Sequence, residues 1–223
     1  MTVVEACVGS LEESVAAEQG GAGRLELCHD LSVGGITPAT ALLDAVKERI
    51  RIPVSVMIRP RGGSFVHSAD EISRMLDDID LARMHGADML VFGVLTEDGA
   101  VDVVRTGRLV ERAGPTPVTF HKAFDQIDDQ MTALEALIDV GVARVLTSGG
   151  AATAIGGVDR LAALVERAAG RIGVMAGGKV RADSARELVA RAGVAEVHAR
   201  CELDPARIRG IVDVLKNVSP GAA

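Results

Sequence analysis

The sequence predicts an α/β fold, a single (β/α)8 TIM barrel, and three observations support this prediction. A short apolar segment, a loop and an alanine-rich helical segment recur eight times along the 223 residues. Glycine pairs and charged residues follow several of the apolar segments, where such barrels place their functional groups. No phosphate-binding loop follows the first apolar segment, which disfavours the alternative, a doubly wound open sheet. We therefore expect one barrel domain over residues 1–223.

The first half of the chain contains four of the expected strand–helix units. Its apolar segments predict strands over residues 3–6, 24–27, 54–58 and 89–92. Helices are expected over residues 10–19, 39–49, 68–85 and 102–113. Ser10 is a suitable N-cap for the first helix, and Gly20 a suitable stop. Ser68 and Glu71 form a capping-box pattern at the start of the third helix.

The second half repeats the same unit four more times. Strands are expected over residues 118–120, 144–147, 172–175 and 196–198. Helices are expected over residues 129–140, 158–169, 182–192 and 205–217. Pro117 opens the first of these strands, since the residue before a proline avoids helical geometry. The segment 219–223 is expected to fray.

The composition limits the classes of function. Hydrophobic residues make up 48% and charged residues 25% of the chain, and no apolar run approaches the length of a membrane span. The net charge of −7 and the aromatic content of 2% argue against nucleic acid or an anionic membrane as partner. The three cysteines do not form a disulfide framework, and the first residues do not resemble a signal peptide. We therefore expect a cytoplasmic protein.

The first two strands carry the same pattern of an acid and a thiol. Glu5 and Cys7 alternate on the first strand, and Glu26 and Cys28 alternate on the second, so each pair shares one face. Stacked on neighbouring strands, they predict a carboxylate pair and a thiol pair that bridges one soft metal ion. The alternatives are that both acids neutralise Arg59 in a buried ion-pair layer, and that the cysteines pack as small hydrophobic residues.

The third strand runs into a loop with two arginines. Arg59 and Arg61 flank Pro60 and precede a glycine pair, which favours an anion site on a stiff backbone. The alternative is two surface arginines in a polar loop. Two further glycine pairs follow the sixth and seventh strands, where barrels often bind phosphate through backbone N–H groups. The expected anion-binding residues in those loops are Ser148, Gly149, Gly177 and Gly178.

Acid–base groups follow the fifth and eighth strands. His121, Lys122 and Asp125 come directly after the fifth strand, and a position at a strand end favours a functional role for the histidine. The alternative is a hydrogen-bonded core histidine. His198 ends the eighth strand, and Cys201 follows it as a possible third soft ligand or an incidental thiol.

Several motifs resemble those of the CutC family of copper homeostasis proteins. They are MIRPRGGSF (57–65), VTFHKAFD (118–125) and RVLTSGG (144–150), with ELC near the start and EVH near the end. The resemblance implies a cytoplasmic TIM barrel that forms a homo-oligomer, a dimer or a tetramer. It also implies copper as cofactor, with Cu(I) bound by Cys7 and Cys28, which agrees with the preference of Cu(I) for thiolates. The turn after His198 departs from the family pattern.

Two functions follow as hypotheses. The first is a copper homeostasis protein of the CutC type that binds Cu(I) through Cys7 and Cys28, with His198 and Cys201 as possible additional ligands. The second is a TIM-barrel enzyme of unknown reaction that acts on a small phosphate- or carboxylate-bearing substrate. Its acid–base residues would be Glu5, Glu26, His121 and Asp125. A purely structural scaffold is the third, weaker alternative.

Overall fold

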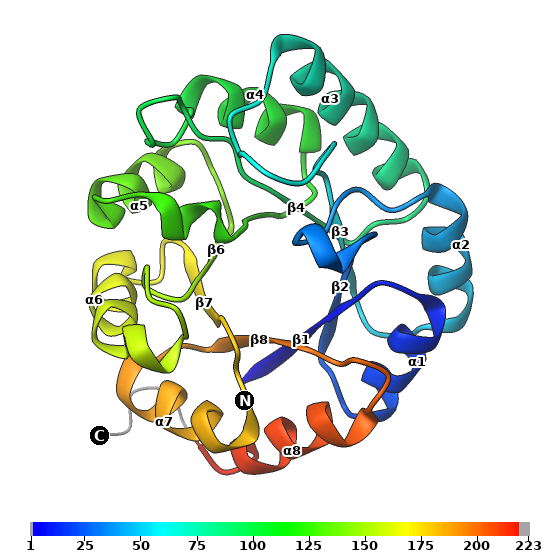
Figure 1. Cartoon of the computed structure of the whole chain (residues 1–223), viewed down its shortest axis with the longest axis vertical. Helices are drawn as coiled ribbons and strands as arrows, with labels where there is room; N and C mark the ends of the chain where they lie inside the picture. Colours follow the sequence, from blue (N-terminus) through cyan, green and yellow to red (C-terminus); the bar gives the residue numbers. More distant parts are fainter. Residues whose placement is uncertain (1, 219–223) are drawn as a thin grey trace.

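The structure is a computed structural model and describes residues 2–218. Within them, eight parallel strands close into a barrel in the order of the sequence, and eight α-helices surround it (Figure 1). The predicted (β/α)8 barrel is confirmed. The strands are β1 (Val3–Val8), β2 (Arg24–Leu27), β3 (Val54–Met57), β4 (Met89–Phe92), β5 (Val118–Phe120), β6 (Arg144–Thr147), β7 (Gly173–Gly177) and β8 (Glu196–Arg200). The helices are α1 (Leu11–Gln19), α2 (Thr40–Arg49), α3 (Ala69–Met84), α4 (Val103–Ala113), α5 (Gln130–Asp139), α6 (Val158–Ala168), α7 (Ala182–Ala192) and α8 (Pro205–Leu215).

The elements have the predicted number and order but differ in extent. β1 continues to Val8 and β8 to Arg200, because the two strands pair with each other as far as the Cys7–Arg200 rung. β7 runs into its glycine pair and ends at Gly177. The short 3-10 helices η1 (Leu31–Val33), η2 (Lys122–Gln126) and η3 (Ile155–Gly157) were not expected. The expected fraying of 219–223 concerns residues outside the described part.

Side-chain caps fix the starts of several helices. The Ser10 side chain accepts a hydrogen bond from the backbone N–H of Glu13 at the start of α1. Ser68 and Glu71 form the predicted capping box at the start of α3, with both reciprocal hydrogen bonds present. These caps satisfy backbone N–H groups that the first helical turn leaves without partners. No helix within residues 2–218 has the length and apolar character needed to cross a membrane.

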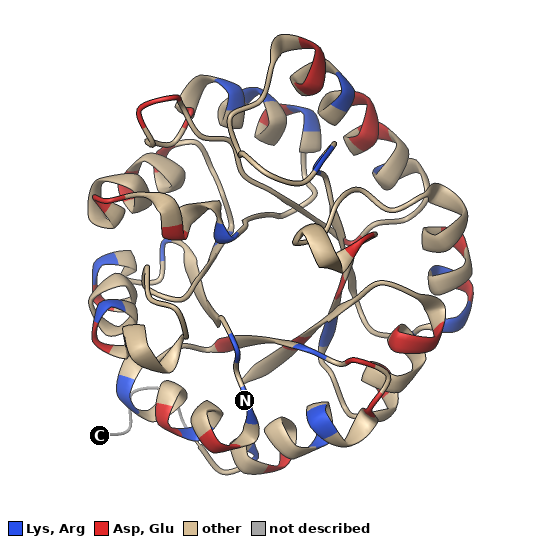
Figure 2. Cartoon of the chain, in the orientation of Figure 1, with Lys and Arg blue, Asp and Glu red and all other residues tan. Residues whose placement is uncertain are grey.

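The main hydrophobic core lies between the sheet and the helices. Alternate strand residues such as Ala6, Leu25 and Leu27 belong to it and are fully buried. The residues between them face the barrel interior, where polar side chains predominate. Figure 2 shows most charged residues on the outer helices and a few on the strands. A separate small apolar cluster contains Cys7, Cys28, Met57 and Val91. The thiols therefore lie inside the barrel, apart from the main core.

Candidate metal centre and anion cavity

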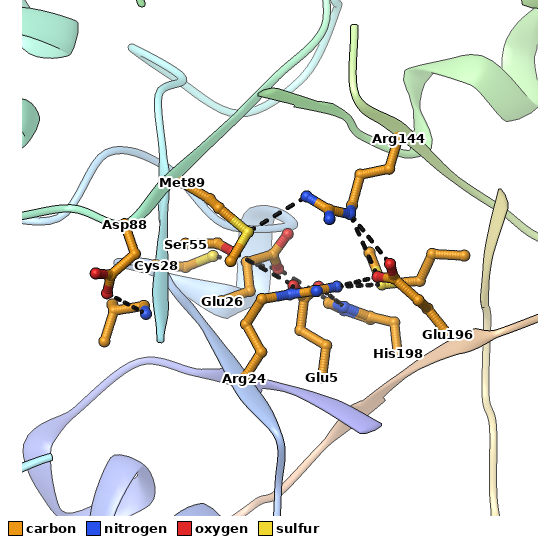
Figure 3. Close-up of polar contacts among 12 residues, drawn as sticks. Glu5, Arg24, Glu26, Cys28, Ser55, Asp88, Met89, Arg144, Glu196 and His198 are labelled. Carbon is orange, nitrogen blue, oxygen red and sulfur yellow. Dashed lines mark hydrogen bonds and ion pairs between the residues drawn. The ribbon is translucent and has the colours of Figure 1, made fainter. Parts of the chain in front are cut away.

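A network of ion pairs crosses the barrel interior, nearer the amino ends of the strands than Cys7 and Cys28 (Figure 3). Arg24 donates to Glu5 at 2.5 Å through Nε and to Glu196 through Nη2, and Arg144 adds a contact of 3.3 Å to Glu196. The sequence analysis missed Arg24 and Arg144 as the cations of this network. The signal was available, because Arg24 precedes Glu26 by two residues on the same strand and so shares its face.

Glu5 is fully engaged by this network and by His198. It accepts hydrogen bonds from Arg24, from His198 Nδ1 at 2.8 Å and from the hydroxyl of Ser55 at 3.4 Å. Burial by itself would raise the pKa of Glu5, but the His198 hydrogen bond and the Arg24 charge outweigh it and lower the pKa to about 2. The alternative that Glu5 neutralises Arg59 is therefore wrong. Glu5 orients His198.

Cys7, Glu26 and His198 form a compact group of metal-binding side chains. One ligand atom of each lies within 4.8 Å of the others. Glu26 Oε2 lies 3.7 Å from His198 Nε2 and 3.6 Å from the Cys28 sulfur. The group comes from three neighbouring strands, because β1 pairs with β2 on one side and with β8 on the other. Thiolate and imidazole are ligands that suit Cu(I) and zinc, so the group fits a soft metal ion.

The prediction that Cys7 pairs with Cys28 and Glu5 with Glu26 across β1 and β2 is wrong, because the two strands pair in a different register. Cys7 lies level with Glu26, and Glu5 lies level with Arg24, so β2 is offset by two residues from the predicted match. Cys28 therefore lies beyond the Cys7 rung, where it packs in the same small cluster as Cys7 and donates a hydrogen bond to Glu26 Oε2 at 3.6 Å. Both thiols remain in contact, but only one is level with the carboxyl group.

The protonation states of this group follow from its contacts. The neighbouring Cys28 thiol lowers the pKa of Cys7 well below its usual value, with burial opposing and His198 assisting. The proximity of Cys7, together with burial, raises the pKa of Cys28. Burial and the nearby Cys7 charge raise the pKa of Glu26. Burial would lower the pKa of His198, but the charge of Glu26 and the hydrogen bond to Cys7 raise it overall. The arrangement favours one thiolate beside an imidazolium.

A cavity of about 540 Å³ opens over this group. Its buried part is lined by Cys7, Glu26 and His198, with Arg59 and His121. Its exposed part is lined by further cations and one acid: Lys122, Lys179, Arg181, Arg200 and Glu202. Cys28 does not line the cavity. The cavity thus joins the metal-binding group to a predominantly basic surface.

The two arginines of the third loop do not lie in one site. Arg59 is buried in the cavity wall, where it donates to the carbonyl groups of Val33, Gly35 and Gly63 and lies 4.7 Å over the Phe65 ring. Burial lowers the pKa of Arg59. The predicted anion site, in which Arg59 and Arg61 bind one ligand together, is therefore not formed, because only Arg59 lines the cavity.

Arg61 turns away from the cavity and binds Glu71. Its Nε and Nη2 donate to the Glu71 carboxylate at 2.5 and 3.2 Å, and Nη1 and Nη2 also donate to backbone carbonyl groups of the same loop. This pairing lowers the pKa of Glu71 to about 2. Arg61 fixes the loop to the start of α3, since Glu71 also completes the capping box there.

His121 is a buried, neutral imidazole in the cavity wall. Its Nδ1 accepts from the backbone N–H of Ala123 at 3.3 Å, and its ring lies 4.8 Å from that of Phe65. Burial and the charge of Arg59 lower its pKa to about 3. A Cβ at Gly93 would lie 2.5 Å from His121 Nδ1, so glycine is required there. With Nδ1 accepting, Nε2 carries the proton and is a donor without a partner within residues 2–218.

The glycine loop after β6 binds a carboxylate of the protein itself. The backbone N–H groups of Ser148 and Gly150 donate to Asp125 at 2.9 and 3.1 Å, as do the side chains of Thr147 and Lys122. Gly149 N–H donates to the Thr147 hydroxyl at 2.9 Å. Of these donors only Lys122 lines the cavity. The prediction of a phosphate site at Ser148 and Gly149 is wrong, because the Asp125 carboxylate already accepts the hydrogen bonds that this loop donates.

The other expected residues fall on both sides of the cavity wall. Gly178 lines the cavity, whereas Gly177 packs within β7, where a Cβ would lie 2.5 Å from Leu146. Cys201 is buried in the main core and contacts the Asp204 carbonyl at 3.9 Å. It does not line the cavity, so the structure does not place it as a third soft ligand.

Comparisons with known proteins agree with this architecture. A sequence model of the CutC family matches residues 2–202. Curated proteins named copper homeostasis protein cutC homolog, from Homo sapiens and Mus musculus, are 46% and 45% identical over 221 residues, which cover 99% of this chain and 80% of each relative. The crystal structure of a putative copper homeostasis protein CutC from Streptococcus agalactiae superposes with a TM-score of 0.86 at 33% identity, covering 91% of this chain and 100% of that one.

Proposed function

We propose that this chain, which belongs to the CutC family, serves copper homeostasis by binding Cu(I) at Cys7. The single observation that carries the proposal is the group of Cys7, Glu26 and His198, whose ligand atoms lie within 4.8 Å of one another. Cu(I) is a soft ion that prefers thiolate and also accepts imidazole. The neighbouring Cys28 thiol and His198 lower the pKa of Cys7 and so favour a thiolate there.

The surrounding residues support a bound ion rather than a passive thiol. Glu5 accepts a hydrogen bond from His198 Nδ1 and so orients the ring, as carboxylates commonly do for metal-binding histidines. Cys28 packs in the same small cluster as Cys7 and supplies a second thiol close to it. Copper is here the cargo, held by Cys7 with His198 as a further ligand and Cys28 as the supporting thiol. We place the protein in the cytoplasm as a homo-oligomer, as the family resemblance implies.

An anaerobic Cu(I) titration of the reduced protein against a competing chelator tests the proposal. We expect wild type to take up Cu(I) and the Cys7→Ser/Cys28→Ser double variant to lose this uptake. Cys201→Ser is the matched control, because its thiol is also buried but lies outside the cavity. Binding that the double variant retains would overturn the proposal.

A second candidate function is an enzyme that acts on a small anionic substrate. The observation in its favour is the cavity lining, in which five cationic side chains accompany Glu26 and Glu202. Glu26 and His121 are its remaining acid–base residues, since Glu5 and Asp125 are engaged by structural partners. Screening anionic metabolites for thermal stabilisation tests it, with His121→Ala as the variant expected to lose the effect. An enzyme of this kind tolerates Cys7→Ser, whereas a copper protein does not.

A further inference from the structure

The cavity over Cys7 is much larger than a metal ion requires. Its volume of about 540 Å³ is typical of sites for small organic molecules. Cu(I) bound by a few protein ligands would occupy only a small part of it. The remaining space is continuous with the surface and is bounded by Phe65, Met57 and Leu146 as apolar walls. A small organic molecule therefore has room beside the ion.

Three residues that line this cavity each have a buried polar atom without a partner in the described part of the chain. Within residues 2–218, Arg59 Nε, His121 Nε2 and Glu26 Oε1 are buried and form no hydrogen bond. All three residues line the cavity and are at least nine-tenths buried. A buried polar atom without a partner is costly, and such atoms commonly mark a position that a ligand fills. Arg59 Nε and His121 Nε2 are donors, so the expected group is an acceptor such as a carboxylate.

The charge of the cavity edge points to the same kind of ligand. Lys179, Arg181 and Arg200 line the exposed part, and none of them forms an ion pair within the described chain. Glu202 is neutralised by Arg207. The protein as a whole carries a net charge of −7, so the cations at the cavity edge run against the overall sign of its charge. Such a field attracts small anions.

The thiols are placed unequally with respect to the cavity. Cys7 lines it, whereas Cys28 is fully buried behind it. A Cu(I) ion on Cys7 therefore has one side open toward the cavity. A soft donor from a molecule in that space would complete its coordination, since Cu(I) prefers sulfur.

We propose that the cavity binds a small anionic thiol together with Cu(I). The sulfur of this molecule joins Cys7 on the ion, and its carboxylate binds Arg59 Nε and His121 Nε2 under the attraction of Lys179 and Arg200. This inference rests on the proposed Cu(I) binding at Cys7 and adds the chemical class of the second ligand. No electron transfer is involved, because copper remains Cu(I). The S–H bond of the thiol breaks as the copper–sulfur bond forms, and its proton is released to water in the open cavity.

The test compares thiol binding to anaerobically Cu(I)-loaded protein by calorimetry. The probes are reduced glutathione, which has a thiol and two carboxylates, 2-mercaptoethanol, which has a thiol without charge, and S-methylglutathione, which lacks the free thiol. We expect glutathione to bind at least about tenfold more tightly than either other probe, a difference that both the charge and the sulfur contribute to. Equal binding of glutathione and 2-mercaptoethanol would overturn the role of the anion, and equal binding of S-methylglutathione would overturn the role of the sulfur.

A matched pair of charge variants locates the site. Lys179→Gln/Arg200→Gln removes two exposed cations at the cavity, and Arg49→Gln/Arg108→Gln removes two exposed cations on α2 and α4. We expect only the first variant to lose the preference for glutathione, by about fivefold to tenfold. Unchanged preference in the first variant would overturn the proposal.

The bare Cu(I) titration, without added thiol, separates this inference from the proposed function. The Lys179→Gln/Arg200→Gln variant is expected to bind Cu(I) as wild type does. If wild type takes up no Cu(I), the proposed function itself fails and this inference with it. If Cu(I) binds but the thiols are not distinguished, only the inference fails.

Discussion

Cys7 on β1 lies level with Glu26 on β2, and Cys28 lies two residues beyond that rung. A thiol and a carboxyl group, rather than two thiols, therefore meet side by side at the inner end of the cavity. Because Cys7 lines the cavity while Cys28 lies outside it and donates a hydrogen bond to Glu26, the two cysteines have different roles. Cys7 faces the cavity as the proposed metal ligand, and Cys28 supports it from behind.

This asymmetry predicts unequal effects of single cysteine substitutions. We expect Cys7→Ser to lower Cu(I) affinity by more than about 100-fold, because it removes a metal ligand. We expect Cys28→Ser to lower it by about tenfold, the usual effect of removing a residue that supports a ligand. Competition against a Cu(I) chelator measures both, with Cys201→Ser expected to match wild type. Equal losses in the two single variants would contradict the distinction between donor and support.

The buried neutral His121 predicts a dependence of stability on pH. Its pKa is about 3 in the folded protein and near 6.5 when unfolded, so the unfolded chain binds more protons between these values. The free energy of unfolding contributed by His121 is therefore constant above pH 6.5 and falls as pH decreases toward 3. We expect wild type to lose about 2 kcal/mol more than His121→Gln between pH 8 and pH 5, measured by urea denaturation. Parallel pH profiles would refute this.

Asp125 is predicted to be a structural residue. Its carboxylate accepts hydrogen bonds from Thr147, Ser148 and Gly150, so Asp125→Ala leaves several partly buried donors without a partner. We expect the free energy of unfolding to fall by about 3 kcal/mol. Asp128→Ala, an exposed acid in the same segment, is the matched control and should change it by less than about 0.5 kcal/mol. An equal effect of both would show that the loop does not need its carboxylate.

The ion-pair network predicts a large cost for neutralising Glu5. Glu5→Gln removes the negative charge that Arg24 binds and replaces one carboxylate oxygen by an NH2 group, so either Arg24 or His198 loses its acceptor. Breaking a buried ion pair from one side costs about 3–5 kcal/mol, and we expect a loss of about 3 kcal/mol because Glu196 remains. Chemical denaturation measures it against Glu48→Gln, an exposed acid on α2. A loss no larger than that of the control would mean that the network contributes little to stability.

The sequence allowed the architecture to be predicted almost completely. Eight apolar segments alternating with helical ones leave few ways to bury the apolar faces, and a closed parallel barrel is the solution at this length. The inward direction of Glu5, Cys7 and Glu26 also followed, because side chains alternate along a strand. The capping box at Ser68 was equally local and equally predictable.

The contacts across strands were decided by the tertiary structure. The register of β1 against β2 sets whether Cys7 meets Cys28 or Glu26, and this depends on barrel closure rather than on either strand. The same holds for Asp125, which satisfies a loop that sequence reasoning assigned to a phosphate. The sequence motifs at the ends of the strands indicated which side chains lie together at one end of the barrel. Only the folded chain determined which of them were already bound to each other and which, such as Cys7 and His121, were left facing the cavity.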